Sequence, residues 1–584
     1  MVTNKYITKI ISALMALAVL LCLATSAFSQ QFQAVYGNNA VTMEYETKLF
    51  DTDQVMDIDI LMDEDDWNDM LENAISEEYY SCDVVVNGKK FYSVGIRPKG
   101  NTSLSSIASD PDTDRYSFKL EFDHYIEGQT CYGLDKLILN NNYADATNMK
   151  EAVVYDMYQY LDVDASLYNY AKICVNGDYR GVYLALEAVE DSFMLRNYGT
   201  EDGNLYKPES MGVGGGDGEE GKDGGGFQGG APQMGNPPEN IQMPQGENDK
   251  MPDEFQFSQN GEQSEDIDFS DFKMGAIGGS GGADLNYTDD DLDSYSTIWD
   301  GEVTSSGKKD HKRVVEALKN ISEGTDPEKY MDVDNILKYM AVHTFVVNDD
   351  SLSGTMAHNY YLYEYNGKLN ILPWDYNLSF GGMSMGGGMG GQSSGATSVI
   401  NDAIDTPFSI TNFFDALLEN EEYLVKYHEY LNELVEKYVN GGEFQKTYER
   451  IRSQINELVA EDPTAFYSYE EYEAAVEMLC EVINLRGESV SGQLDGTIPS
   501  TDDGQKADSS TLIDGSGIEL SVMGSMSMGG GAGEGIGAPG GRGDGWQMRT
   551  PGGSVDEQQT GASGKEAGNS DGNEALQKTE SGGV

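Results

Sequence analysis

The sequence predicts an α+β protein with a strand-rich N-terminal half, residues 49–209, and a helix-rich C-terminal half, residues 285–494. Short apolar runs in the first half alternate with a period of two, as half-buried strands do. Runs in the second half have the longer spacing of helices. Residues 210–284 are rich in Gly, Pro, Gln and Asp and bury too little apolar surface to offset the entropy of ordering. We therefore predict a disordered Gly-rich insertion between the two halves.

The N-terminal half contains seven predicted strands. Asn87-Gly88 and Asn176-Gly177-Asp178 are tight-turn sequences that join neighbouring strands into hairpins. Asp63 is placed to cap a helix after the first strand, and residues 148–161 have the apolar spacing of a second helix. The predicted strands are 55–61, 82–86, 90–96, 116–122, 134–139, 171–175 and 181–186.

The C-terminal half is predicted to be helical apart from one hairpin. The hairpin strands, 360–365 and 369–372, are joined by Asn366-Gly367. Residues 495–584 are rich in Gly, Ser and Asp and have no periodicity, so we predict a disordered acidic tail. The predicted helices are 309–321, 332–347, 410–439, 442–459 and 468–494.

The first 29 residues have the pattern of a secretory signal peptide. Lys5 and Lys9 precede an apolar run from Ile10 to Leu23, and small residues follow up to Ser29. This run is short for a retained membrane anchor, and no later segment is apolar enough to cross a bilayer. We therefore expect a secreted or cell-surface protein with no stable membrane span after signal cleavage.

The charge balance and the metal-ligating residues argue against two classes of function. The chain has 37 Lys and Arg against 100 Asp and Glu, a formal net charge of −63, whereas a nucleic-acid surface needs clustered Lys and Arg. Its five Cys and five His lack the spacing of zinc ligands. The acidic balance is compatible with cations and basic partners.

The predicted hairpin has polar oxygen donors at both ends. Asp349 and Asp350 follow the helix 332–347, Asn359 precedes the first strand, and Asp375 follows the second. Carboxylates and an amide at the ends of a hairpin can converge on a hard cation, because magnesium binds oxygen ligands together with substrate phosphates. The alternative is an ordinary acidic turn. The residues alone do not separate Asp349 from Asp350 as the carboxylate that would act on a substrate.

The N-terminal half contains a candidate phosphate-binding loop at residues 97–103. Arg97, Lys99 and Asn101 combine a guanidinium, an ammonium and an amide with the backbone of Gly100, groups that can surround phosphate oxygens. The alternative is an ordinary turn, since the loop lacks the pattern of a known phosphate-binding motif.

Three further residues of this half are candidates for binding a cofactor. Lys119 lies on the strand 116–122, and Glu151 on the following helix is placed to form an ion pair with it. Glu187 ends an apolar strand, where a nucleotide base could lie against backbone groups. The alternative for Lys119 is an ordinary solvated lysine, and the alternative for Glu187 is a strand-end carboxylate with no special role.

These residues together resemble the CotH family, the spore-coat-protein-H type of secreted atypical protein kinase. The resemblance extends from about Val55 to Gly382. Its segments are Arg97-x-Lys99-Gly100-Asn101-Thr102-Ser103, the strand Tyr116–Phe122 with Lys119, Val175 to Tyr183, Leu205-Tyr206-Lys207, His358 to Tyr363, and Pro373-Trp374-Asp375-Tyr376. Asn377 departs from the pattern because family members commonly carry Asp there.

The resemblance implies a divergent two-lobed, protein-kinase-like fold with a β-rich N-lobe and a helical C-lobe. It implies transfer of the γ-phosphate of ATP to Ser or Thr of an exported protein with Mg²⁺ or Mn²⁺. Lys119 would then contact phosphate, Asp350 would be the catalytic carboxylate, and Asn359 and Asp375 would hold the metal. The alternative function is a non-catalytic structural or binding protein of the cell surface on the same fold.

Overall fold

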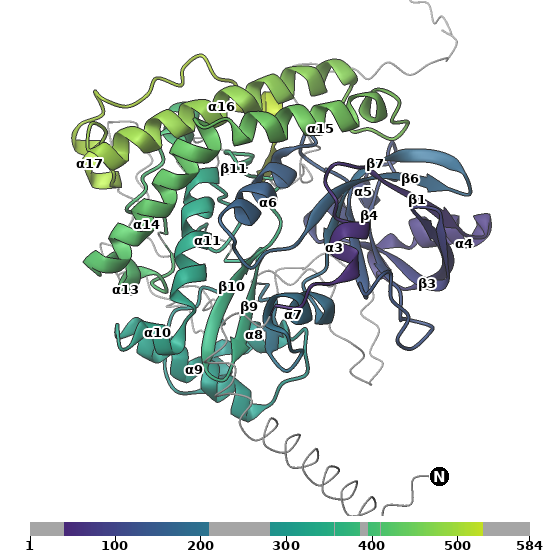
Figure 1. Ribbon diagram of the computed structural model, residues 1–584, viewed down its shortest axis with the longest axis horizontal. Coiled ribbons are helices and arrows are strands. Elements are labelled where there is room, and N and C mark those ends of the chain that lie inside the picture. Colours follow the sequence, from purple (N-terminus) through teal and green to yellow (C-terminus); the bar gives the residue numbers. More distant parts are fainter. Residues whose placement is uncertain (1–39, 210–280, 355–356, 386–394, 409, 529–584) are drawn as a thin grey trace, which may run out of the picture. The chain divides into compact units, whose positions relative to one another are not determined.

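Seven strands of the N-terminal half close into a barrel in the order β1-β2-β3-β4-β5-β7-β6 (Figure 1). Neighbouring strands are antiparallel, except that β1 and β6 pair in parallel and close the ring. Alternate residues such as Ile58, Ile60 and Val84 are fully buried in its core. The strands are β1 Met56–Leu61, β2 Tyr80–Val86, β3 Lys89–Lys99, β4 Ser117–Glu121, β5 Lys136–Asn140, β6 Tyr168–Val175 and β7 Asp178–Glu187.

This computed structural model describes residues 40–209, 281–354, 357–385, 395–408 and 410–528, which we call the described residues. The predicted signal peptide, nearly all of the predicted insertion and the end of the predicted tail lie outside them. The chain is a mixed α/β protein, as the sequence predicts. A closed seven-stranded barrel does not by itself define a two-lobed kinase fold.

Five described helices accompany the barrel, and α6 and α7 also contact the C-terminal half. α6 packs against β6 and also against α11 and α15, and it is buried on nearly all sides. Asp63 accepts a hydrogen bond from the Asp65 amide at 3.0 Å and caps α4, as predicted. These helices are α3 Glu44–Lys48, α4 Glu64–Glu72, α5 Thr102–Ser109, α6 Lys150–Tyr160 and α7 Asp191–Tyr198.

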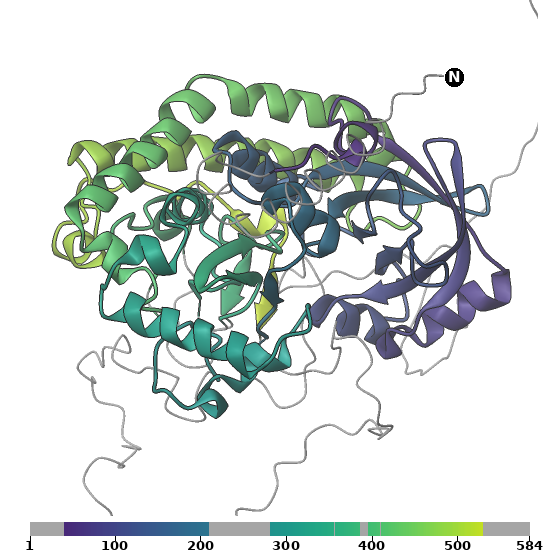
Figure 2. The same cartoon turned by 60° about the horizontal axis from the view of Figure 1, so that its bottom comes forward.

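The helical half surrounds a three-stranded sheet of order β10-β9-β8. The hairpin β9 Tyr360–Tyr365 and β10 Lys368–Pro373 is confirmed, and β8 Asn204–Tyr206 from the N-terminal half joins its edge. Figures 1 and 2 show α10, α11, α13 and α14 on the side of the hairpin away from the barrel, whereas α15 extends toward the barrel and packs against β7. The longer helices are α9 Lys308–Ser322, α11 Val333–Val346, α14 Glu421–Glu433, α15 Glu443–Ala460 and α16 Tyr469–Asp495. Shorter ones are α8 Ser296–Asp300, α10 Pro327–Tyr330, α12 Ala396–Ile400 and α13 Asp415–Leu418.

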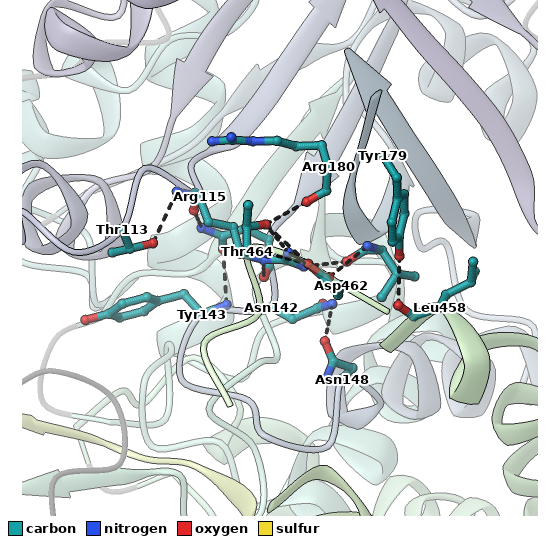
Figure 3. A network of polar contacts seen from close by, with 12 residues as sticks. Thr113, Arg115, Asn142, Tyr143, Asn148, Tyr179, Arg180, Leu458, Asp462 and Thr464 are labelled. Atoms are coloured by element: carbon teal, nitrogen blue, oxygen red, sulfur yellow. Dashed lines mark hydrogen bonds and ion pairs between the residues drawn. The ribbon is translucent and has the colours of Figure 1, made fainter. Parts of the chain in front are cut away.

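A buried ion pair joins the barrel to the turn between α15 and α16 (Figure 3). Arg115 Nη1 donates to both oxygens of Asp462, at 2.9 and 2.8 Å, and the two side chains are 2% and 1% exposed. Arg115 also donates to the carbonyls of Asn141 and Val182, while the Val182 amide donates to Asp462. Because every charge has several partners, the cost of desolvating the pair is offset locally.

Three predicted boundaries are wrong. The predicted loop 97–103 is in fact the end of β3, which continues to Lys99, followed by the start of α5. The predicted helix 410–439 is divided into α13, α14 and a π-helical turn Leu434–Val439, because Asn420 caps a new helix. The predicted insertion includes residues 281–284, yet Ala283 is buried and its carbonyl accepts the Tyr360 hydroxyl at 2.5 Å.

The predicted disordered tail is wrong for residues 495–528. This segment forms α17 Asp502–Ala507 and β12 Met526–Met528, and β12 pairs in parallel with β11 Met383–Met385. Its composition misled the prediction because the backbone, rather than a periodic apolar face, makes most of the contacts. Among the described helices, none combines the length and apolar character needed to span a membrane.

The ion pair predicts a large difference between two glycine substitutions in the hairpin β6–β7. At Gly181 (φ +152°), a Cβ atom would clash with Arg115 Nη1 and would lie 2.7 Å from the Asp462 oxygens. We expect Gly181→Ala to lower the free energy of unfolding by about 3–5 kcal/mol, the range for breaking a buried ion pair.

Gly177→Ala is the matched control for this prediction, because Gly177 also has positive φ (+88°) but has open space around it. It should cost only about 1–2 kcal/mol, the penalty of left-handed backbone. Denaturant unfolding of both variants measures the difference, and equal losses would contradict the role given to the ion pair.

Candidate functional site

One pocket is lined by both halves of the protein. Its walls come from the end of β3, the start of α5, the first turn of α6 and the segments on either side of the hairpin β9–β10. The barrel contributes mainly amides, hydroxyls and Lys99, whereas the hairpin region contributes Asp350, Asn359 and Asp375. The pocket therefore brings together several of the sequence-predicted site residues.

The barrel side of the pocket is suited to an anion. After Lys99, Gly100 has φ +131°, and α5 begins at Thr102 without a side-chain cap on its first amides. Thr102 and Ser103 line the pocket at this helix start, where exposed N–H groups and the helix dipole favour negative charge. Lys99 and Lys207 add two ammonium groups to the same pocket. This combination matches the requirements of a phosphate group.

The opposite side holds a hydrogen-bonded cluster around Asp350. Asn359 Nδ2 donates to the Asp350 carbonyl at 2.7 Å and to its carboxylate at 3.0 Å. The other carboxylate oxygen lies 2.6 Å from His358 Nε2. Because both carboxamide contacts use the nitrogen, the carbonyl oxygen of Asn359 is the group left to face a cation. Asn359 also has positive φ (57°), a conformation that asparagine tolerates better than most residues.

The charge of this cluster affects His358. Burial disfavours the imidazolium, but the hydrogen bond to Asp350 and the nearby charges of Asp350, Glu209 and Asp375 raise the pKa of His358 overall. A protonated His358 would form a charge-assisted hydrogen bond with Asp350. His358 therefore positions Asp350 and partly balances the acidic pocket.

Asp375 is held in an unusual backbone conformation by its neighbours. It has φ +60°, and Asn348 Nδ2 donates to its carbonyl at 3.3 Å. The next residue is anchored in the core, because the Tyr376 hydroxyl lies 2.5 Å from that of Tyr158 and 3.0 Å from His343 Nδ1. Such strained conformations persist only where the surroundings hold them, and they concentrate at functional sites.

Glu151 is the second buried carboxyl group of the pocket. It is 4% exposed, and Asn140 donates to its Oε2 at 2.9 Å, but Oε1 has no hydrogen-bond partner within the described residues. Burial and the charge of Asp375 raise the pKa of Glu151 to about 8. Burial is also the main cause that raises the pKa of Asp375, which Lys99 partly opposes. Two crowded carboxyls with an unsatisfied oxygen are the arrangement that a divalent cation would relieve.

The structure distinguishes Asp349 from Asp350 as a pocket residue. Asp350 lines the pocket, whereas Asp349 is exposed and does not. Asn101 lines the pocket and donates to Glu209 at 3.3 Å.

Three predicted cofactor-binding residues lie elsewhere. Arg97 forms an ion pair with Glu77. Glu187 is fully buried and accepts hydrogen bonds from Arg196 and from the Tyr45 hydroxyl.

The predicted pair of Lys119 with Glu151 is wrong, because Lys119 donates to Glu190 at 2.7 Å. Glu190 follows β7 at the barrel rim, where Lys136 also contacts it, so two ammonium groups share one carboxylate.

A smaller cavity adjoins the pocket and includes Arg97 and Lys119. The two share Lys99, Lys207 and Trp374 as lining residues, and the smaller one has apolar walls from Ile138, Ala188, Val303 and Tyr361. The smaller cavity also contains the charged side chains of Arg97, Lys119 and Glu190.

Sequence reasoning missed several pocket residues. His358 could have been noticed because it directly precedes Asn359 in the resembling segment, and Lys207 because it ends another such segment. Asn140 and Glu209 carried no signal in the sequence, since their role depends on which strand ends and loops meet in space.

Within the part of the chain that the structure describes, no three His, Cys, Asp or Glu side chains are grouped to hold a metal ion by themselves. Mg²⁺ usually binds through one or two carboxylates together with substrate phosphates, and Asp375 is a carboxylate that lines this pocket.

The barrel, the helical half and the pocket define an α+β protein whose pocket brings the start of α5 together with carboxylate and amide oxygens. The chain belongs to the CotH family, because the family model described as CotH kinase protein matches residues 96–490, more than half of its length. The match includes the pocket residues from Lys99 to Asp375. No curated protein matches the chain.

The support of Tyr376 by His343 predicts an acid-sensitive stability. Burial lowers the pKa of His343 from 6.5 to about 3, so the unfolded chain takes up the proton first. The contribution of neutral, buried His343 to the free energy of unfolding is fully present above pH 6.5. It is lost as the pH falls toward 3, by up to roughly 5 kcal/mol. We expect His343→Gln to show a smaller decline in unfolding free energy over this range. Parallel pH profiles of the two proteins, measured by denaturant titration, would contradict this role.

Proposed function

We propose that this protein is a secreted CotH-like kinase that transfers the γ-phosphate of ATP to Ser or Thr of an exported or surface protein. The observation that supports this most is the convergence, in one pocket, of Lys99 and the start of α5 with Asp350, Asn359 and Asp375. Phosphoryl transfer depends mainly on positioning and electrostatic stabilisation, and these groups supply both. The exported location rests on the pattern of residues 1–29.

The residues of the pocket fit a Mg²⁺ or Mn²⁺ ion. Asp375 and the carbonyl oxygen of Asn359 would hold it, and the unsatisfied Oε1 of Glu151 is a third oxygen in the same pocket. A bound cation would neutralise charge on the transferring phosphate. Lys99 and the amides of α5 would orient the phosphate oxygens from the barrel side.

Asp350 is the residue that we assign to the substrate hydroxyl. Its carboxylate is oriented by Asn359 and His358 at 3.0 and 2.6 Å, so it would be held in place before substrate binds. In this role it would accept a hydrogen bond from the Ser or Thr hydroxyl and take its proton during transfer. Phosphate would pass to the hydroxyl oxygen as the bond to ADP breaks.

The variant Asp375→Asn tests whether phosphorylation requires the Asp375 carboxylate. The substitution preserves shape but removes the carboxylate that would hold the cation, so we expect phosphorylation to fall by at least about 100-fold. Labelling of the purified protein or of a Ser-containing acceptor with ATP labelled on the γ-phosphate, plus Mg²⁺ or Mn²⁺, measures it. Asp349→Asn is the matched control, since Asp349 is outside the pocket and should keep full activity.

If the Asp375→Asn variant is labelled with phosphate as fully as the wild type, the kinase proposal is wrong. If wild-type protein binds ATP with Mn²⁺ but transfers no phosphate to any acceptor, the non-catalytic binding protein of the cell surface becomes the better description.

A second prediction concerns which lysine contacts phosphate. The family resemblance points to Lys119, but Lys119 is committed to Glu190, whereas Lys99 lines the main pocket beside Asp375. We expect Lys99→Met to weaken binding of ATP with Mn²⁺ by about 10- to 100-fold, the loss of a charge-assisted hydrogen bond. Lys119→Met should weaken it less. Calorimetric titration of both variants decides, and the reverse order would return the role to Lys119.

A further inference from the structure

The residues that follow α16, 496–528, return from the helical half to the pocket, and we call them the C-terminal strap. They lie beyond the family match, which ends at residue 490. The first part of the strap is held along residues 397–405, where Asn401 Nδ2 donates to the Ile513 carbonyl and Gln505 Nε2 donates to the Asn401 carbonyl. Its last part reaches the pocket, which Met526 lines.

One side of the strap is fixed to the loop that precedes Glu151. The Ala146 amide donates to the Met523 carbonyl, and the fully buried Lys150 donates through Nζ to the Gly524 carbonyl, both at 3.1 Å. Gly524 has φ +82°, and a Cβ atom there would lie 2.5 Å from the Ala144 carbonyl oxygen. Only glycine allows this close approach of the two backbones. The strap is therefore attached directly beside the residue that bears the unsatisfied carboxylate.

The other side of the strap is fixed to the segment that follows Asp375. The Met526 amide donates to the Gly382 carbonyl at 2.8 Å, and β12 then pairs in parallel with β11, with Met383 opposite Met526. Both methionines are buried and line the pocket. The paired strands have the same sequence, because Met-Ser-Met-Gly-Gly-Gly occurs at 383–388 and again at 526–531.

We propose that the C-terminal strap is a positioning element that sets how the Asp375 and Glu151 walls of the pocket face each other, and thereby the affinity for a divalent cation with nucleotide. The two walls come from different halves of the chain, and the strap bonds to both within four residues, Met523 to Met526. Met383 and Met526 lie opposite each other and both line the pocket with apolar side chains. This proposal rests on the proposed nucleotide-binding function.

The test uses Gly524→Ala in the full chain, with Gly517→Ala as the matched control. Gly517 lies in the same strap, is exposed and has open space where a Cβ atom would be added. Two readouts are needed: the dissociation constant for ATP with Mn²⁺, by calorimetry, and the hydrogen-exchange rates of the amides of residues 376–385. We expect Gly524→Ala to bind about 10-fold or more weakly, as loss of residues that orient metal ligands does, and to exchange faster. Gly517→Ala should match the wild type in both.

The outcomes are distinguishable. Unchanged affinity in Gly524→Ala, with or without a lower melting temperature or faster exchange, would overturn the positioning role and leave the strap as packing only. If the wild type does not bind ATP with Mn²⁺, the proposed function fails. In that case, equal hydrogen-exchange rates in Gly524→Ala and Gly517→Ala would overturn the positioning role of the strap as well. If Gly524→Ala does not fold, Met526→Ser provides the same comparison, because it keeps the strand pairing and removes only the pocket contact.

Discussion

The buried ion pair between Arg115 and Asp462 is the interaction on which the arrangement of the two halves depends. Arg115 lies two residues before β4 and also donates to the carbonyl of Asn141, a pocket residue, while Asp462 lies between α15 and α16. Each charge is nearly inaccessible to water, so either partner alone would carry a large desolvation cost. The pair therefore joins the barrel to the turn between α15 and α16. Gly181 is part of the same constraint, because any side chain there would occupy the position of the ion pair.

The pocket contains buried carboxyl groups whose negative charge is only partly balanced by the side chains around them. Glu151 and Asp375 both have pKa values raised by burial, and one Glu151 oxygen lacks a donor, while Asp350 is balanced by His358 and Asn359. Proteins rarely bury such groups without compensation elsewhere. Here the compensation that chemistry suggests is an external cation and the phosphates that accompany it. The left-handed backbone at Asp375 is next to the buried hydroxyl of Tyr376, which contacts Tyr158 and His343.

The C-terminal strap extends this site beyond the region shared with the CotH family. Family membership accounts for the pocket up to the segment after Asp375, but the Met526 wall comes from outside the match. A site assembled this way can keep the same reactive groups while the strap changes the space and the rigidity around them. The two paired strands, β11 and β12, have the same Met-Ser-Met sequence and pair in register.

The sequence by itself determined the local structure and the identities of the reactive groups. Turn residues such as Asn366-Gly367 and period-two alternation act over a few neighbours, so the hairpin β9–β10 and the barrel strands could be predicted, as could Asp350, Asn359 and Asp375 as candidates. Only the tertiary structure decided which groups share a pocket. It joined Lys119 to Glu190 and placed Glu187 in the core, and it brought the distant Met526 beside Met383. Those choices depend on barrel closure and on backbone contacts between residues far apart in the chain, which leave no periodic trace in the sequence.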